Sequence, residues 1–297
     1  MTFSIVAVDR DAQEIGLAIA SCCWDAGQVC MARAEVGAIA SQASGNLAFL
    51  TQFFEGLAGG ADPGAMLDRF KASDGEIETR QIGMIAFDGA GWSFTGAACS
   101  PWAGHRTGND CACQGNILVG PQVADEMAEA FESTSGPLYV RLCAALSAGD
   151  EAGGDLRGKQ SARLAVKKKG FGRPGSDTLI DIAIEDHAEP VREIGRILDV
   201  GMVLKEILGL LSEFSEAPMD AKPEVLARWR ALLDDKRDCR YLDWWESLAD
   251  RFYQIGDVER ALEAYRVILS INPAMRRVFE SATEQGTFPA ALASVLL

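Results

Sequence analysis

The pattern of apolar and polar positions predicts a strand at the very start of the sequence. Phe3, Ile5 and Ala7 occupy every second position of the segment TFSIVAV, and a period of two is typical of a strand with one buried face. Most domains leave their first residues loose. A strand that begins at Thr2 therefore raises the question of what holds a hydroxyl amino acid at this place.

Further strands are predicted by short apolar runs that end at turn residues. The sequence DGAG separates two such runs and is typical of a hairpin turn. The segment that follows this hairpin, FTGAACSPWAGHRTG, is rich in small residues and is interpreted as a loop. The predicted strands lie at residues 2–8, 14–21 and 34–42, in a hairpin at 81–96, and at residues 161–168 and 178–186.

Helices are predicted where apolar residues recur at intervals of three and four. Asp62 and Pro63 have the residue types of a helix N-cap and first helical position. The predicted helices lie at residues 46–58, 63–70, 121–133 and 137–149. Strands in pairs, helices in pairs and then strands again indicate an α+β fold, and a sandwich of two sheets with helices on both outer faces fits this order.

The strand pattern stops near residue 198, which divides the chain into two predicted parts, 1–198 and 199–297. A helix is predicted over 200–214 and a linker over 217–223. Residues 242–275 resemble a single tetratricopeptide repeat. The matching positions are Trp245, Leu248, Ala249, Phe252, Gly256, Ala261, Tyr265 and Pro273, whereas Ile268 stands where the repeat usually has alanine.

One repeat cannot bury its own apolar face, and peptide-binding arrays need about three. We therefore expect residues 199–297 to form a helical appendage that packs on the first part or on a second subunit. The resulting expectation is a homo-oligomer in which this helical region is a candidate subunit contact.

Charge and composition narrow the classes of partner. The 297 residues carry a net charge of −15, which would be repelled by nucleic acid and by anionic membranes, so neither is expected as a partner. No stretch approaches the roughly 20 apolar residues that span a bilayer, and the start lacks the features of a signal peptide. The expectation is a cytoplasmic protein that acts on a small molecule.

The cysteines do not have the spacing of a structural metal site. Of eight, Cys22 and Cys23 are adjacent, and Cys111 and Cys113 are separated by one residue, whereas zinc pairs are usually two to four residues apart. No glycine-rich nucleotide motif is present either. We expect reduced thiols, no metal and no organic cofactor.

The sequence gives little support for a serine or cysteine nucleophile activated by a histidine. Only two histidines occur, His105 and His187. No G-x-S-x-G motif exists to place a triad serine. Cys99 with His105 would make a thiol–imidazole pair, although the apolar surroundings of Cys99 favour an inert thiol. His105 is either a ligand-binding residue in its small-residue loop or a structural one.

Thr2 has a chemistry that depends on its position. If Met1 is removed, the hydroxyl and a free α-amine belong to the same residue, and the amine, with a pKa near ~8, can accept the hydroxyl proton at neutral pH. This chemistry needs a rigidly held chain end, which a strand start provides. The alternative is a first strand with only a structural role, and it would hold if Met1 were retained.

Several motifs resemble those of the domain-of-unknown-function 1028 family. They occur in the family's order over roughly residues 1–198: MTFSIVA, ASQ followed by Asn46, RQIG, FTGAACSPWAGH, QGNILVGP, AGGDLRGKQSA and DIAIEDH. The family is similar in fold to N-terminal nucleophile (Ntn) hydrolases. The resemblance implies a four-layer αββα sandwich and the hydrolysis of amide-like bonds in a small nitrogen-containing metabolite.

The resemblance also implies roles for individual residues. Thr2 would be nucleophile and base, and Gln42 and Asn46 would donate hydrogen bonds to the oxyanion. Arg157 would bind a substrate carboxylate, or would pair internally with Asp155. The expected catalytic residues are Thr2, Gln42, Asn46 and His105, and the expected substrate-binding residues are Trp102, Asn116, Asp155, Arg157, Gln160 and Ser161. The alternative function is a non-catalytic member of the fold that binds a small ligand, or a protein partner through its helical tail.

Overall fold

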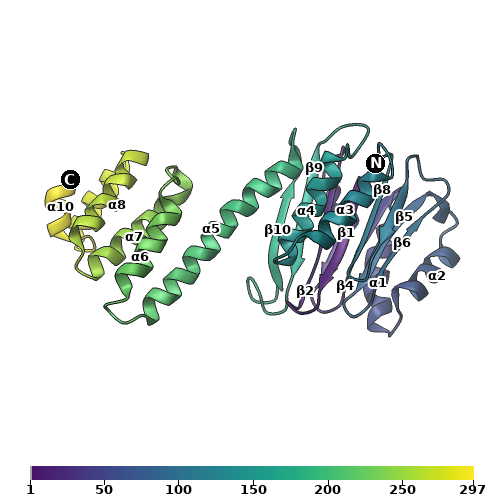
Figure 1. Cartoon of the computed structure of the whole chain (residues 1–297), viewed down its shortest axis with the longest axis horizontal. Coiled ribbons are helices and arrows are strands. Elements are labelled where there is room, and N and C mark those ends of the chain that lie inside the picture. The colour runs from purple at the N-terminus through teal and green to yellow at the C-terminus, as the bar shows by residue number, and fades with distance from the viewer. Residues whose placement is uncertain (1) are drawn as a thin grey trace. The chain divides into compact units, whose positions relative to one another are not determined.

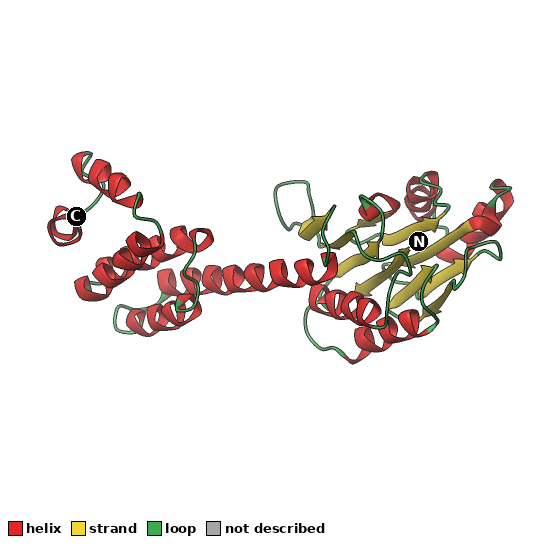
Figure 2. Cartoon of the chain, turned by 90° about the horizontal axis from the view of Figure 1, so that it is seen from above, coloured by secondary structure: helices red, strands yellow, loops and turns green. Residues whose placement is uncertain are grey.

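The computed structural model describes residues 2–297, so the question of Met1 lies outside the described residues. The chain divides into two compact units, Met1–Leu198 and Asp199–Leu297. The first unit combines antiparallel sheets with helices, and the second contains helices (Figures 1 and 2). The prediction of a mixed helix-and-sheet fold with a helical C-terminal region is confirmed.

The first unit contains two antiparallel sheets. The larger has the order β10-β9-β2-β1-β8-β7 and the smaller β3-β4-β5-β6. The strands of the larger sheet are β1 (Thr2–Asp9), β2 (Glu14–Ser21), β7 (Gly104–Thr107), β8 (Cys111–Asn116), β9 (Ser161–Lys167) and β10 (Thr178–Ile184). Those of the smaller sheet are β3 (Cys30–Arg33), β4 (Gly37–Ala43), β5 (Arg80–Ala86) and β6 (Gly91–Thr95).

Two pairs of helices accompany these sheets. They are α1 (Ala48–Ala58), α2 (Pro63–Ser73), α3 (Gln122–Ser133) and α4 (Leu138–Glu151). Phe131 on α3 and Leu142 on α4 pack against one face of the larger sheet. Phe53 on α1 and Phe70 on α2 pack against the smaller sheet, where they meet Ile82 of β5. Figure 1 shows α3 and α4 beside β1, and α1 and α2 beside β5 and β6.

A third set of buried residues joins the two sheets. Val6 and Ile19 of the larger sheet share one apolar cluster with Ala40 and Ile85 of the smaller. Phe3 and the other odd positions of β1 belong instead to the cluster that includes α3 and α4. Even positions of β1 therefore face the second sheet. The prediction of a single buried face was wrong, because the smaller sheet covers the other one.

Three strands were missed in the sequence. The loop prediction after the hairpin was wrong in part, because Gly104–Thr107 forms β7 at the edge of the larger sheet. Its partner β8 has the sequence CACQGN and is buried at every position. Small and polar residues at buried positions give neither alternation nor a β-branched run, so the pattern of the sequence could not reveal these strands. The strand β3 has only four residues, which are too few to establish a period of two in the sequence.

The second unit has its own apolar core. Its helices are α5 (Pro190–Glu216), whose first residues belong to the first unit, α6 (Lys222–Leu233), α7 (Leu242–Gln254), α8 (Val258–Ile271), α9 (Met275–Glu284) and α10 (Ala290–Leu296). Trp229, Trp245 and Tyr265 are among the largest side chains buried there. Gly256, with φ of 84°, makes the turn between α7 and α8, a left-handed conformation that favours glycine. The helix predicted over 200–214 begins ten residues earlier, at Pro190, and α6 takes the end of the predicted linker.

Within residues 2–297, none of the helices combines the length and the apolar character needed to span a bilayer.

Candidate functional site

The candidate residues gather where several strands of both sheets end or begin. Thr2 starts β1, and its register partner is Asn116 at the end of β8. Ser21 ends β2 next to them, because Phe3 pairs with Ala20. In the smaller sheet, Gln42 of β4 is the register partner of Gln81 of β5. Because antiparallel neighbours alternate in direction, strand ends and strand starts meet at one edge.

Thr2 is buried and held on two sides. Its side chain faces the smaller sheet, as the parity of β1 requires, and the residue is 7% exposed. Thr2 Oγ1 lies 3.2 Å from Ser21 Oγ, which in turn accepts a hydrogen bond of 3.2 Å from the thiol of Cys23. The carbonyl of Thr2 accepts a hydrogen bond from Gln42 Nε2 at 3.2 Å. Both the backbone and the hydroxyl of Thr2 are therefore fixed by neighbours.

A network of buried amide side chains lies behind Thr2, between the two sheets. Gln81 Oε1 accepts from Gln42 Nε2 at 2.8 Å and from Asn116 Nδ2 at 3.0 Å. Gln81 Nε2 donates to the carbonyls of Gly115 at 2.7 Å and Gly104 at 3.0 Å. Gln81 thus connects the four strands β4, β5, β7 and β8 across the gap between the sheets.

A second branch of this network runs through Gln114. Its Nε2 donates to Ser4 Oγ at 2.6 Å, and the Ser4 hydroxyl donates to Gln42 Oε1 at 2.7 Å. Gln114 Oε1 accepts from Ser93 Oγ at 3.0 Å. A Cβ at position 83 would lie 2.0 Å from Gln114 Oε1, so a residue larger than glycine there would displace the Gln114 amide from its hydrogen bonds. This contact gives a physical reason for the glycine of the RQIG motif.

The network is costly unless every polar atom is paired. A buried amide without a partner costs about 1–3 kcal/mol. Among the described residues, the buried side-chain atoms without a hydrogen bond are Glu14 Oε2 and Trp229 Nε1, and neither belongs to this network. A fully paired polar network holds the ends of these strands in one arrangement. It therefore makes the surroundings of Thr2 rigid.

His105 is at the exposed end of the same network. Its Nδ1 lies 2.9 Å from Thr95 Oγ1, which accepts a hydrogen bond from Gln81 Nε2. Partial removal of the ring from water lowers the pKa of His105 below its ordinary value, so the ring is neutral at pH 7. No hydrogen bond of Nε2 is found among the described residues, which leaves this atom available to a ligand. Its neighbour Trp102 covers Gly104, where a Cβ would lie 2.5 Å from the indole.

Asn46 belongs to a different cluster. Its Nδ2 donates to Asp74 Oδ2 at 3.1 Å, and its Oδ1 accepts from the amide of Ala48 in the first turn of α1. Arg80 Nε donates to the same carboxylate oxygen at 3.0 Å. The hydrogen bond from Arg80 lowers the pKa of Asp74 to about 2. The described contacts of Asn46 thus fix the start of α1 rather than Thr2.

Asp155 and Ser161 tie down the loop that follows β2. Asp155 Oδ2 accepts from the amide of Cys22 at 2.8 Å, and Ser161 Oγ donates to the carbonyl of Cys23 at 2.6 Å. Arg157 Nη2 donates to Asp155 Oδ2 at 3.3 Å, and 43% of the arginine side chain is exposed. Gln160 Nε2 donates to Asp186 Oδ1 at 3.1 Å. Asp155 and Arg157 therefore lie in a loop next to the end of β2, and Ser161, the first residue of β9, is the register partner of Ser21, whereas the Gln160 side chain bonds to the segment after β10.

The enclosed space in these loops is small. A cavity of about 10 Å³ is bounded by Phe3, Ser21, Asp155 and Ser161, among others, and has the size of one water molecule.

The thiol of Cys99 donates to the carbonyl of Arg80 at 3.3 Å, and burial raises the pKa of this thiol. Within residues 2–297, no cluster of three or more His, Cys, Asp and Glu side chains has the geometry of a metal site.

Four residues of this site were missed in the sequence, namely Ser4, Ser21, Gln81 and Gln114. The available signal was a polar residue inside an otherwise apolar strand, as in RQIGMIA and CACQGN. Such a residue has to find a partner when the strand is buried on both faces. The pairing itself depends on the second sheet, which the local pattern does not position.

Comparisons with known proteins match the first unit. The model of a family of unknown function (DUF1028) matches residues 2–194. The crystal structure of a DUF1028 protein from Silicibacter pomeroyi is similar, with 25% sequence identity and a TM-score of 0.61. That similarity covers 67% of this chain and 88% of the other. No curated protein matches the sequence significantly.

Proposed function

The chain belongs to the family of unknown function DUF1028, and from this premise we propose that it is an Ntn-type amidohydrolase acting on a small nitrogen-containing metabolite. Thr2 would be the nucleophile, once processing has made it the first residue of the chain. The observation that carries this proposal is the position of Thr2. Its hydroxyl and carbonyl are both fixed, at a strand start that adjoins a buried polar network.

The proposal includes the fold. Helices α3 and α4, the larger sheet, the smaller sheet, and helices α1 and α2 would form four layers in the order αββα, as in Ntn hydrolases. The three apolar clusters support this order, since one packs helices on each sheet and the third joins the sheets. In the second unit, α7 and α8 would form a single tetratricopeptide-like hairpin. Its support is the burial of Trp245, Phe252 and Tyr265 and the left-handed glycine between the helices.

The chemical step follows from the two groups of one residue. Thr2 Oγ1 attacks the carbonyl carbon of the substrate amide, and the free α-amine accepts the hydroxyl proton. The C–N bond breaks, the ammonium returns this proton to the leaving nitrogen, and an ester of Thr2 remains. Water then attacks the ester and releases the carboxylic acid. No other residue is needed as base, since an α-amine has a pKa near ~8.

The contacts of the neighbours suggest how they would assist. Gln42 donates to the carbonyl of Thr2, so we assign it a positioning role rather than direct contact with the oxyanion. His105 Nε2 would be the donor to the substrate, and Asn116 would hold the end of β8 beside it. Arg157 would bind a substrate carboxylate while it keeps its pair with Asp155. Ser21 would hold the Thr2 hydroxyl in a fixed rotamer.

A second candidate is a non-catalytic member of the fold that binds a small ligand at this edge. The burial of Thr2 and the hydrogen bond of its hydroxyl to Ser21 favour it, because both restrict access to the nucleophile. In this case His105 and Arg157 would bind the ligand and Thr2 would be structural.

Acyl labelling separates these two functions. The mature protein is incubated with a small activated ester, digested and analysed by mass spectrometry. The amidohydrolase proposal predicts modification at residue 2, its loss in Thr2→Ala and its retention in Thr2→Ser. If the wild type and Thr2→Ala are labelled to the same level, and only at residues other than residue 2, the result would support the binding protein.

The control for this experiment keeps the hydroxyl and blocks the amine. A form with an uncleaved extension before Thr2 has the same strand and the same side chain but no free α-amine. We expect no modification of Thr2 in this form. Equal labelling of the blocked and free forms would contradict the role of the amine as base.

A further inference from the structure

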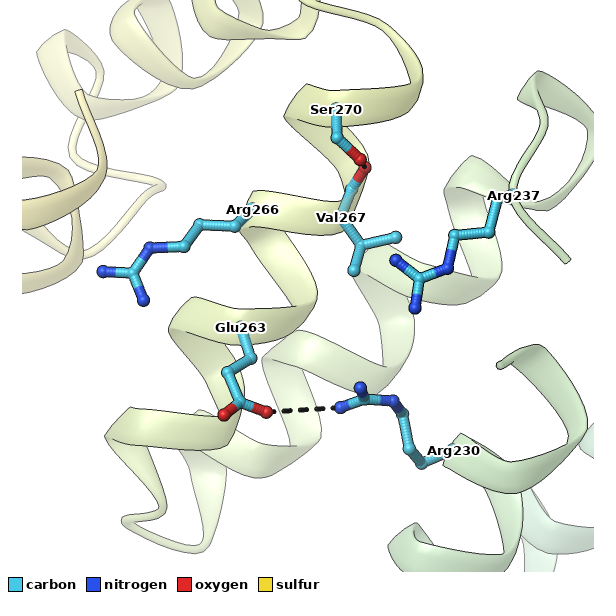
Figure 3. Close-up of a pocket in the computed structure, with 6 residues that line it drawn as sticks. All are labelled: Arg230, Arg237, Glu263, Arg266, Val267 and Ser270. Atoms are coloured by element: carbon cyan, nitrogen blue, oxygen red, sulfur yellow. Dashed lines mark hydrogen bonds and ion pairs between the residues drawn. The ribbon is translucent and has the colours of Figure 1, made fainter. Parts of the chain in front are cut away.

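The second unit contains a pocket lined by three arginines. Arg230 lies in the last turn of α6, Arg237 in the loop that follows it, and Arg266 on α8 (Figure 3). The pocket has a volume of about 430 Å³ and is completed by Glu263, Val267 and Ser270, all on α8. Its lining residues have a formal charge of +2, although the whole chain carries −15. The pocket is therefore positively charged within an acidic protein, which favours an anionic ligand.

Two of the guanidinium groups are held by one tryptophan. The carbon at the centre of the Arg230 guanidinium lies 5.3 Å from the centroid of the Trp245 ring, and that of Arg237 lies 5.4 Å away. Trp245 is fully buried, and its indole donates to the carbonyl of Lys236 at 2.9 Å. Figure 3 shows the heads of Arg230 and Arg237 on one side of α8, while Arg266 extends to the other side. Arg230 and Arg237 are therefore preorganised as a pair.

The pair is only partly neutralised by the protein. Arg230 contacts Asp234 Oδ1 at 3.0 Å and Glu263 Oε2 at 3.4 Å. Arg237 donates to the backbone carbonyl of Asp234 at 3.2 Å. Within the described chain no carboxylate lies within ion-pair distance of Arg237. Arg237 therefore has no carboxylate counter-ion among the described residues. Beside it lies Arg230, whose charge is shared between the carboxylates of Asp234 and Glu263.

We propose that this pocket binds a phosphate-bearing small molecule, with the phosphoryl group between Arg230 and Arg237. A guanidinium is a planar fork of donors that matches phosphate oxygens. The tetrahedral oxygens of a phosphoryl group accept from two such forks at once, whereas one carboxylate matches a single fork. The Val267 side chain gives an apolar wall for the rest of the ligand. The space of about 430 Å³ is a shallow depression that is open to solvent, and it is large enough for a phosphoryl group and the adjoining part of a small ligand.

This inference is independent of Thr2, and its test uses the full-length protein. Inorganic phosphate is titrated by isothermal calorimetry at constant ionic strength, with acetate as a carboxylate of single charge. We expect phosphate to bind and acetate to bind at least about tenfold more weakly. Arg237→Gln should weaken phosphate binding about tenfold, the effect of losing one charged hydrogen-bonding group. Glu263→Gln should strengthen it, because a competing carboxylate is removed from Arg230.

Matched variants control for net charge. Arg277→Gln removes the same charge from an exposed position on α9, and Glu280→Gln removes an exposed carboxylate from the same helix. Both should leave the affinity for phosphate within about twofold, because neither side chain lines the pocket and exposed charges are screened by salt. The proposal is overturned if phosphate does not bind, if acetate binds as tightly, or if Arg237→Gln and Arg277→Gln have the same effect. Circular dichroism of Arg237→Gln verifies that the helices are retained.

Discussion

At the scale of single residues, Gln81 connects the two sheets next to Thr2. Its Oε1 accepts hydrogen bonds from Gln42 and Asn116, and its Nε2 donates to Thr95 Oγ1, which contacts His105. Gln42 in turn donates to the carbonyl of Thr2. These bonds of Gln42 join residues about 40 positions apart in the sequence, which no local pattern encodes. This is why Thr2, Gln42, His105 and Asn116 were predicted as candidates and Gln81 was not.

The buried network predicts a large effect of losing Gln81. In Gln81→Leu, Gln42 Nε2 and Asn116 Nδ2 lose their shared acceptor, and the carbonyls of Gly104 and Gly115 lose a donor. We expect the free energy of unfolding of the first unit to fall by about 3 kcal/mol, measured by urea denaturation. The control is Gln52→Leu at an exposed position of α1, where the change should be within about 0.5 kcal/mol. Equal effects of the two substitutions would show that the network contributes nothing.

The pair of Asp74 and Arg80 predicts a dependence of stability on pH. Because the pKa of Asp74 is lowered to about 2, its contribution is fully present above the ordinary carboxyl value and is lost as the pH falls through about 2. Asp74→Asn should therefore be less stable than the wild type at pH 7, and the difference should shrink in acid. Urea midpoints between pH 7 and pH 2 measure this. Asp88→Asn, at an exposed position, should have the same urea midpoints as the wild type over this pH range. If the midpoints of Asp74→Asn stay below those of the wild type by a constant amount at every pH, the pair of Asp74 and Arg80 is not the cause.

At the scale of elements, regular patterns were predicted well and short or small-residue strands were not. Helices α2 and α3 and strands β2 and β9 lie where their periodicity placed them. The internal strand β8, which lies between β1 and the edge strand β7, was missed because its alanine, cysteines and glycine are buried without being strongly apolar. A strand of this kind is specified by its neighbours rather than by its own pattern. Its position beside β1 nevertheless determines where Asn116 meets Thr2.

The cap of α2 gives a prediction at this scale. Asp62 Oδ1 accepts a hydrogen bond of 2.8 Å from the amide of Ala65, and Pro63 occupies the first turn. Asp62→Ala should lower the free energy of unfolding by about 1 kcal/mol. Asp68→Ala, at an exposed position within the same helix, removes the same charge without a cap and should cost less than about 0.5 kcal/mol. Thermal denaturation of both variants measures the difference, and a larger loss for Asp68→Ala would exclude the cap as the cause.

At the scale of the whole molecule, the chain contains two separate kinds of core. The first unit has three apolar clusters around its sheets, and the second has one cluster among helices. The sequence indicated this change of character through the loss of strand patterns and the tetratricopeptide-like spacing. It did not indicate the arginine pocket, because Arg230 and Arg237 lie beside Glu263 and Val267 of α8 only when folding has placed α6 and α8 together.

Because each unit has its own apolar core, a substitution that destabilises one unit should leave the stability of the other unchanged. Trp245→Ala removes a fully buried indole from the second unit and should destabilise that unit by about 3–5 kcal/mol. Hydrogen exchange measured by mass spectrometry should show faster exchange in residues 222–297 and unchanged exchange in β1, β2 and β8. Trp24→Ala, where the side chain is largely exposed, should change neither unit. Faster exchange throughout both units in Trp245→Ala would show that the two cores unfold as one.

The central claim is that Thr2 acts through its own free amine, and the first residue of the mature protein tests it most directly. Intact-mass analysis and N-terminal sequencing are applied to the protein purified from its native host without a tag. The account predicts a chain that begins at Thr2 with an unmodified α-amine. A mature chain that retains Met1, or a blocked amine on Thr2, would contradict it.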